Sequence, residues 1–320
     1  MAEVDIFNGD ADGICALIQL RRAEPRSSQL VTGVKRDISL VDKVEPAAGD
    51  RITVLDISLD KNREGVLKAL ANGAEVFYVD HHHAGEIPEH DRFTAIIDTD
   101  PNVCTSLLVN GHLRGKYAPW AVTGAFGDNL IETAQTIAKP LGLSREQLST
   151  LEKLGTFMNY NAYGSSLRDL HFAPAELFEA ARSFDTPFEF VEEARETYER
   201  LEQGYRQDMA SASAVTPQRR TERTAAFIFP DEPWARRVSG VYSNDLANAF
   251  PKRAHAVLTE RADGTYLVSV RAPLEDKRGA DQLCRRFPTG GGRAAAAGIN
   301  ALPGEELDSF LDAFAAAYES

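Results

Sequence analysis

The chain has 320 residues, of which 43% are hydrophobic and 26% are charged, and its formal net charge is -13. This length allows two domains that each bury a core, and the balance of apolar and charged residues is typical of a soluble globular protein. The acidic charge argues against non-specific binding of long duplex DNA, but a local cluster of Arg, Lys and metal ions can still bind a small phosphorylated substrate.

The sequence carries no sign of a secreted or membrane protein. Three scattered cysteines, Cys15, Cys104 and Cys284, lack metal-ligand spacing and fit a reducing compartment. The apolar runs are too short to span a membrane, and the acidic N-terminus leads directly into an expected strand rather than a signal peptide. We therefore expect a cytoplasmic protein with no membrane partner.

The first expected strand, 3–8, ends at a Gly-Asp-Ala-Asp-Gly turn, and a helix follows over 14–20. Asp10 and Asp12 therefore lie between a strand and a helix, where one acid would be enough to cap the helix. Two carboxylates at this spacing repel each other, and a divalent cation would relieve the repulsion. A solvated turn is the alternative interpretation of this segment.

The next two expected strands also end in acids. The run 51–58 is rich in β-branched residues and contains Asp56, and the run 74–79 is followed by Asp80 and the histidines 81–83. A buried strand that ends in an acid and imidazoles can present metal ligands at its carboxyl end, which is where open α/β sheets bind their ligands. A surface turn that binds metal only incidentally is the alternative.

Two more apolar runs follow in the N-terminal half. The run 93–98 predicts a strand whose Asp98 shapes a turn, and the run 120–126 leads to Asp128, which we count as the fourth acid at a strand end. A helix cap is the alternative role for Asp128. Strands that alternate with helical segments predict an α/β fold with a mainly parallel sheet flanked by helices.

Two further regions follow the N-terminal domain. A long charged helical pattern over 186–214 predicts a linker, and a second, smaller α/β domain follows the polar stretch 216–223. A triple-glycine run precedes an expected small-residue helix over 294–297, whose N-terminus would favour an anion. We therefore expect domains at 1–185 and 216–320, joined by a linker helix at 186–215, with a hinge at 215–223 and the active-site cleft between the domains.

Several of these residue types point to metal-assisted phosphoryl transfer. The candidate ligands are too many for one tetrahedral zinc ion, and two ions about 3.5–4 Å apart would clamp the attacking and leaving oxygens. The glycine run can hold phosphate through backbone N–H groups, although a flexible turn is the alternative. The candidate metal ligands are Asp10, Asp12, Asp56, His81, His82 and Asp128, and the candidate phosphate ligands are Arg271, Gly290, Gly291, Gly292 and Arg293.

These motifs together resemble the DHH phosphoesterase family, and the C-terminal part resembles the DHH-associated substrate-binding domain. The resemblance covers nearly the whole chain and implies two manganese ions, for which magnesium or cobalt could substitute. By this resemblance, Asp10 and Asp12 would each bind one of the two ions, and Asp56 would bridge them. His81 and Asp128 would complete the ligands of the second ion. His82 would be catalytic and face the scissile phosphate, and Asp80 would orient the histidines.

The resemblance also implies a metal-bound hydroxide as nucleophile and a distal phosphate held by Arg271, Arg293 and the glycine N–H groups. Two departures stand out: family members often have a His or an acid near the position of Asn8, and their glycine motif usually ends in His where this chain has Arg293. The permanently charged guanidinium favours phosphate binding over proton transfer.

The predicted function is manganese-dependent hydrolysis of short single-stranded oligonucleotides, or of linear or cyclic dinucleotides, to mononucleotides. An exopolyphosphatase is the alternative enzyme, and a non-catalytic nucleotide-binding protein is the alternative from another class. Tyr242 and Phe287 are the candidate platforms on which a base could stack. A homodimer is a further candidate assembly.

Overall fold

The computed structural model describes residues 1–319, and the chain divides into two compact units, Met1–Gln203 and the part from Gly204 onward. Each unit contains its own sheet and its own hydrophobic core. The division falls within helix α9 (Arg195–Ala214). The single helix expected over 186–214 is in fact two, because α8 (Pro187–Glu193) ends at Ala194 in a non-helical conformation. The predicted domain limits and hinge stay predictions.

The first unit contains a five-stranded sheet of order β2-β1-β3-β4-β5, in which every neighbouring pair is parallel. The predicted α/β class and parallel sheet are therefore confirmed. The short second strand was not expected from the sequence. The strands are β1 (Glu3–Phe7), β2 (Gln29–Val31), β3 (Arg51–Leu55), β4 (Glu75–Asp80) and β5 (Phe93–Ile97).

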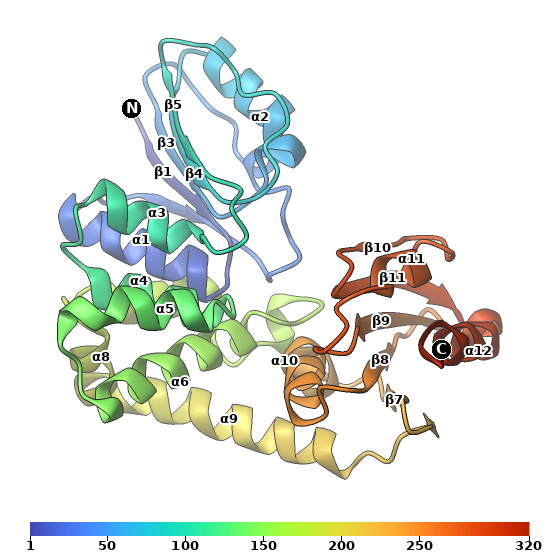
Figure 1. The fold of residues 1–320 in the computed structure, drawn as a ribbon. Helices are drawn as coiled ribbons and strands as arrows, with labels where there is room; N and C mark the ends of the chain where they lie inside the picture. Colours follow the sequence, from blue (N-terminus) through green and yellow to red (C-terminus); the bar gives the residue numbers. More distant parts are fainter. Residues whose placement is uncertain (320) are drawn as a thin grey trace. The chain divides into compact units, whose positions relative to one another are not determined.

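Helices cover both faces of this sheet, as Figure 1 shows. Alternate residues of a strand point to opposite faces, and Val54 and Tyr78 pack in one core with residues of α2 such as Val66. On the opposite face, Phe77 contacts His112 of α3 with ring centroids 5.4 Å apart. The helices next to the sheet are α1 (Ala11–Ala23), α2 (Leu59–Ala71) and α3 (Thr105–His112).

Helix α4 (Ala118–Gly127) is buried on nearly all sides. The prediction that Asp128 follows a strand is wrong, because the run 120–126 is helical and Asp128 is the C-cap of α4. An unbroken apolar run has no periodicity that separates a buried strand from a buried helix. The remaining helical segments of this unit are η1 (Val41–Lys43), α5 (Ile131–Ala138), η2 (Lys139–Leu141), α6 (Arg145–Asn161), η3 (Leu167–Asp169) and α7 (Pro174–Ala181).

The second unit contains a six-stranded mixed sheet of order β10-β11-β9-β8-β7-β6. Only β7 and β8 pair in parallel, and the predicted turn around Gly264 joins β8 to β9 as a hairpin. The strands are β6 (Arg219–Arg220), β7 (Thr224–Phe229), β8 (Ala254–Glu260), β9 (Thr265–Arg271), β10 (Gly290–Gly292) and β11 (Ala296–Pro303).

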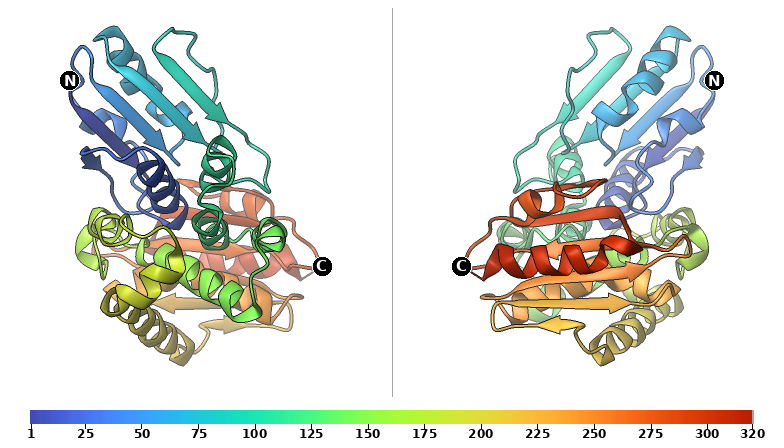
Figure 2. Two further views of the ribbon diagram at one scale, coloured as in Figure 1. Left: turned by 90° about the vertical axis from the view of Figure 1, so that its left-hand side faces the viewer. Right: turned by 90° about the vertical axis from the view of Figure 1, so that its right-hand side faces the viewer.

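The helices of the second unit cover both faces of its sheet. Phe310 and Phe314 of α12 pack with Leu283 of α11 and with one face of the strands, and α12 lies along that face in Figure 2. On the other face, Tyr242 of α10 contacts Phe229 of β7. The helical segments are α10 (Pro233–Ala249), α11 (Ala280–Cys284), η4 (Gly304–Glu306) and α12 (Leu307–Tyr318).

The expected small-residue helix over 294–297 does not exist. Ala296 and Ala297 begin β11, which pairs with β9 on one side and with the glycine strand β10 on the other. Alanine favours helices intrinsically, but pairing on both sides decides the conformation here. The expectation that a helix N-terminus beside the glycine run would attract an anion is therefore wrong.

Candidate metal centre

The parallel sheet brings three of the predicted motifs to one edge. Strands β1, β3 and β4 are parallel neighbours, so their carboxyl ends meet on the same side. Asp10 follows β1, Asp56 follows β3, and Asp80 is the last residue of β4. This edge is where open α/β folds bind ligands.

Three side chains at this edge are arranged as a metal site. Asp56, His81 and His82 each offer a ligand atom, and these atoms lie within 4.8 Å of one another. His81 Nε2 is 3.5 Å from Asp56 Oδ1 and 3.8 Å from Asp128 Oδ2. Asp128 therefore reaches the predicted cluster from a helix end instead of a strand end.

The two histidines are oriented by partners on their other ring nitrogens. Nδ1 of His81 is 2.8 Å from the carbonyl oxygen of Val103, and Nδ1 of His82 is 2.7 Å from Oδ1 of Asp80. A carbonyl or a carboxylate can only accept, so each Nδ1 carries a proton and each Nε2 is the ring nitrogen left for the site. Metal-ligating histidines are held in this way by their outer partners.

Several carboxylates lie close to Asp56. Its side chain is buried and accepts a hydrogen bond of 3.1 Å from the Thr105 hydroxyl. Burial and the nearby carboxylates, Asp12 foremost, raise the pKa of Asp56 well above its usual value. Its backbone also has a φ of 59°, a conformation that is uncommon for residues other than glycine.

Two neighbouring carboxylates, Asp80 and Asp128, are also buried or half-buried without full compensation by protein groups. Burial raises the pKa of Asp128 to about 6, although Lys35 and His81 oppose the shift. Among residues 1–319, Oδ2 of Asp80 is buried without a hydrogen-bond partner. The nitrogen and oxygen donors of this cluster suit a divalent transition-metal ion, whose positive charge would relieve the repulsion.

Asp12 lies beside this cluster, but its carboxylate already has partners. Its Oδ2 accepts a hydrogen bond from the backbone N–H of Thr105 and its Oδ1 accepts one from Ser106, both of 2.7 Å. Asp12 thus binds the first N–H groups of α3. Its predicted role as a metal ligand stays a prediction and would require the same two oxygens.

Asp10 is paired with a lysine that the sequence analysis did not single out. Oδ1 of Asp10 caps α1, while its Oδ2 is 2.5 Å from Nζ of Lys35. Burial opposes ionisation of both groups, but their mutual attraction lowers the pKa of Asp10 and raises the pKa of Lys35. Lys35 lies in an irregular segment between β2 and η1, where no sequence pattern marks it.

Asn8 connects these two residues. Its Oδ1 accepts a hydrogen bond of 3.2 Å from the backbone N–H of Asp10, and its Nδ2 donates one of 3.2 Å to the carbonyl oxygen of Lys35. The amide therefore bridges the Asp10 turn and the Lys35 segment.

The predicted phosphate ligands all lie in the second unit. Nε of Arg271 donates to Oδ1 of Asn244 over 2.8 Å, so its guanidinium is oriented by a helix. Gly290 and Gly292 approach other backbone atoms closely, whereas no described atom lies within 4 Å of a Cβ built on Gly291. Arg293 follows β10 and is exposed. Their roles in substrate binding stay predictions.

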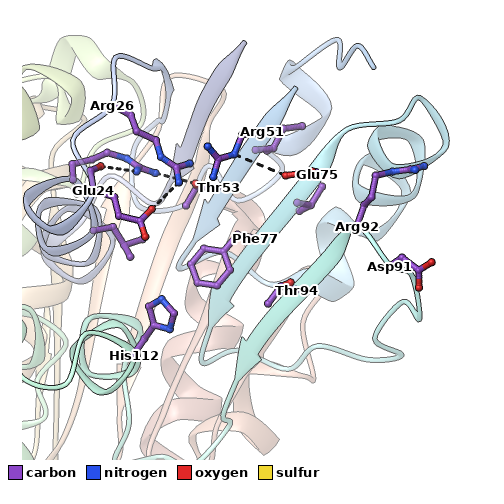
Figure 3. A pocket seen from close by; sticks show the side chains of 14 residues that line it. Glu24, Arg26, Arg51, Thr53, Glu75, Phe77, Asp91, Arg92, Thr94 and His112 are labelled. Carbon is purple, nitrogen blue, oxygen red and sulfur yellow. Dashed lines mark hydrogen bonds and ion pairs between the residues drawn. The ribbon is translucent and has the colours of Figure 1, made fainter. Parts of the chain in front are cut away.

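A cavity of about 470 Å³ lies at the other end of the first sheet, where β3 and β4 begin (Figure 3). Two ion pairs lie in its lining: Arg26 is 2.7 Å from Glu24, and Arg51 is 3.9 Å from Glu75. None of the predicted metal or phosphate ligands lines this cavity, so the acidic edge is the candidate functional site.

No protein-family model matches the sequence. No curated protein matches it either. The helices of residues 1–319 include none that is both long and apolar enough to cross a membrane.

Solved structures do share the fold. An exonuclease RecJ bound to manganese has a TM-score of 0.65 and 17% identity over 98% of this chain and 90% of that one. RecJ of Thermus thermophilus in complex with Mn²⁺ has a TM-score of 0.63 and 16% identity, over 98% of this chain and 51% of that one. The pGpG-specific phosphodiesterase PggH of Vibrio cholerae has a TM-score of 0.55 and 16% identity over 98% and 97% of the two chains. The chain thus has a RecJ-like fold, and the fold expected from the DHH motifs is confirmed.

Proposed function

We propose that the chain is a divalent-metal-dependent phosphodiesterase that hydrolyses short oligonucleotides or dinucleotides to mononucleotides. The observation that carries this proposal is the cluster of Asp56, His81 and His82, whose ligand atoms lie within 4.8 Å of one another at the carboxyl edge of the sheet. The RecJ-like fold supports it, since RecJ is an exonuclease and PggH is a pGpG-specific phosphodiesterase.

Manganese is the ion we propose, with magnesium or cobalt as substitutes. The mixture of carboxylate and imidazole donors suits manganese better than magnesium, and both RecJ structures are manganese complexes. Asp56, His81 and Asp128 would hold the ion. When bound, a divalent ion polarises a phosphoryl oxygen and lowers the pKa of water.

His82 is the residue we assign to proton transfer and to contact with the scissile phosphate. Burial lowers its basicity, but the hydrogen bond and charge of Asp80 outweigh this, and the pKa of His82 is raised overall. The bond from Nδ1 to Asp80 leaves Nε2 as the atom that can take up a second proton. A proton on Nε2 would bind a phosphate oxygen and could pass to the leaving oxygen.

We propose that the second unit binds the phosphate farther from the cleaved bond. Arg271 and Arg293 are permanently cationic, so their guanidinium groups would attract a phosphate. Gly291 is the member of the glycine run with open space beside its Cα, so its backbone can be approached closely. A short substrate is favoured by the acidic net charge of -13.

One observation favours exopolyphosphatase activity as the second candidate. The two aromatic residues considered for base stacking are both buried: Tyr242 packs against Phe227 and Phe229, and Phe287 packs against Phe310. Neither side chain offers a free ring face for a base in this conformation. A polyphosphate chain needs no such platform.

The test is product release with Mn²⁺ from a 5′-phosphorylated RNA dinucleotide and, in parallel, from polyphosphate. We expect mononucleotides from the dinucleotide, and we expect Asp56→Asn to lower the rate by roughly 100-fold or more because the ion loses its central carboxylate. Asp98→Asn is the matched control, since Asp98 also follows a strand but is exposed in a turn.

The outcomes separate the candidates. Phosphate from polyphosphate alone would establish the exopolyphosphatase. An unchanged rate in folded Asp56→Asn would refute the proposed centre. Tight nucleotide binding without turnover of either substrate would instead support a non-catalytic binding protein.

A further inference from the structure

We propose that the ammonium group of Lys35 takes the place of one of the two divalent ions implied by the motifs, so that the centre holds a single divalent ion beside a built-in cation. The inference rests on the proposed metal-dependent function. It concerns how many ions the site holds and which side chain supplies the missing charge.

The contacts of Lys35 resemble those of a bound cation. Nζ lies 2.5 Å from Oδ2 of Asp10, 2.9 Å from Oδ1 of Asn159 and 3.9 Å from Oδ1 of Asp128. It also lies 5.5 Å from the ring centroid of Tyr163, within the range of a cation–π contact. Two of the three N–H donors of the ammonium group bind Asp10 and Asn159, and Asp128 lies at ion-pair distance.

The oxygens that bind Lys35 belong to residues expected to bind metal. Asp10 is one of the two acids assigned to the first motif, and its buried carboxylate has one oxygen on the cap of α1 and the other on Nζ. A divalent ion at Asp10 would have to displace the ammonium or sit against a like charge, which disfavours its binding.

Asn8 fits this arrangement. Where the resemblance leads one to expect a His or an acid, the Asn8 side chain bonds the backbone of both Asp10 and Lys35. An amide at this position therefore fixes the lysine segment against the acidic turn. The loss of one expected ligand and the presence of the ammonium are two parts of the same local structure.

The remaining donors suit one ion. Asp56 and His81 belong to a single group of candidate ligand atoms whose third member is His82, the residue assigned to proton transfer. Asp128 Oδ2 lies 3.8 Å from His81 Nε2 and completes the donors proposed for one ion. Asp128 is thus placed between the two cationic positions, with its Oδ1 toward Lys35 and its Oδ2 toward His81.

The test counts manganese ions. The purified full-length protein is dialysed against Mn²⁺, bound metal is measured by mass spectrometry, and the electron paramagnetic resonance spectrum is recorded. We expect one Mn²⁺ per wild-type chain with the spectrum of an isolated ion. Lys35→Ala should raise the count to two and give an exchange-coupled spectrum, because the ammonium no longer fills the position beside Asp10.

Lys43→Ala is the matched control, since Lys43 pairs with exposed Asp37 in the same part of the chain and should leave the count at one. Two coupled ions in the wild-type protein would overturn the inference and leave the metal-dependent function standing. A count that stays at one in folded Lys35→Ala would also overturn it. No bound ion in the wild type would overturn the proposed function, and the inference with it. The wild-type count decides the matter even if Lys35→Ala does not fold.

Discussion

At the residue scale, Asp12 is both a predicted metal ligand and the residue that binds the start of α3. Its two carboxylate oxygens accept the backbone N–H groups of Thr105 and Ser106, which lie 93 and 94 positions further along the chain. Charge-assisted bonds of this kind are stronger than those between neutral groups. The spacing of the acids in the Asp10 turn marked Asp12 as functional, but spacing cannot reveal which backbone groups a distant helix brings to it.

Substitution of Asp12 by Asn separates the structural role from a purely metal-binding one. In metal-free protein we expect Asp12→Asn to lower the free energy of unfolding by about 1–3 kcal/mol, because an amide can accept only one of the two buried bonds. Chemical denaturation in EDTA measures this, with exposed Asp98→Asn as control. A rise in stability would mean that repulsion from Asp10 and Asp56 outweighs the two bonds to α3.

Lys35 could not have been predicted from the sequence. It lies in an irregular segment, and its partners Asp10, Asn159 and Asp128 come from three separate parts of the chain. An isolated lysine in such a segment is most often solvated. Only the folded chain shows that the side chain of this one is largely buried, with an exposure of 23%.

At the scale of elements, the strands were predictable and some of their neighbours were not. β3 and β4 were recognisable from β-branched residues that end at an acid, and parallel order then placed Asp56 and His81 together. The helix α4 and the strand β11 were misassigned, because a buried apolar run and an alanine run each fit either conformation. Asp128 nevertheless lies near His81, with Oδ2 3.8 Å from Nε2, and its role as a ligand stays a prediction.

The glycine strand β10 contains two kinds of glycine, and alanine substitution should distinguish them. A Cβ on Gly290 would lie 1.8 Å from the carbonyl oxygen of Cys284, so Gly290→Ala should cost about 1–3 kcal/mol of stability. No described atom lies within 4 Å of a Cβ on Gly291. Gly291→Ala should therefore change stability by less than about 0.5 kcal/mol.

The same pair tests the role of β10 in substrate binding. If a phosphate approaches the backbone at Gly291, Gly291→Ala should raise KM several-fold while kcat and the thermal midpoint stay close to wild type. Steady-state kinetics with the dinucleotide and thermal unfolding provide the two readouts. An unchanged KM would remove Gly291 from the proposed phosphate site.

At the scale of the whole molecule, two α/β units were foreseen because strands and helices alternate in both halves of the sequence. The structural division falls between Gln203 and Gly204, inside α9, where a continuous helical pattern gives no sign of a boundary. All of the candidate metal ligands belong to the first unit, and all of the candidate ligands of the distal phosphate belong to the second.

This distribution predicts that metal stabilises the two units unequally. In calorimetry with Mn²⁺ at about 100 times its dissociation constant, the first unit should gain about 2.7 kcal/mol, because the ion binds only its folded form. The transition of the second unit should stay where it is. Asp56→Asn should abolish the shift. Equal shifts of both transitions, or one merged transition, would show that the units unfold as a single cooperative body.

The pair of Lys35 and Asp10 affects how strongly the centre depends on the supply of divalent metal in the cell. A divalent ion must be acquired from the cell and can be lost to chelators or replaced by a competing metal. An ammonium group is synthesised with the polypeptide, so its charge is present in every folded copy of the chain. A centre built in this way would depend on the cell for one ion instead of two, and its response to metal depletion would follow a single binding step.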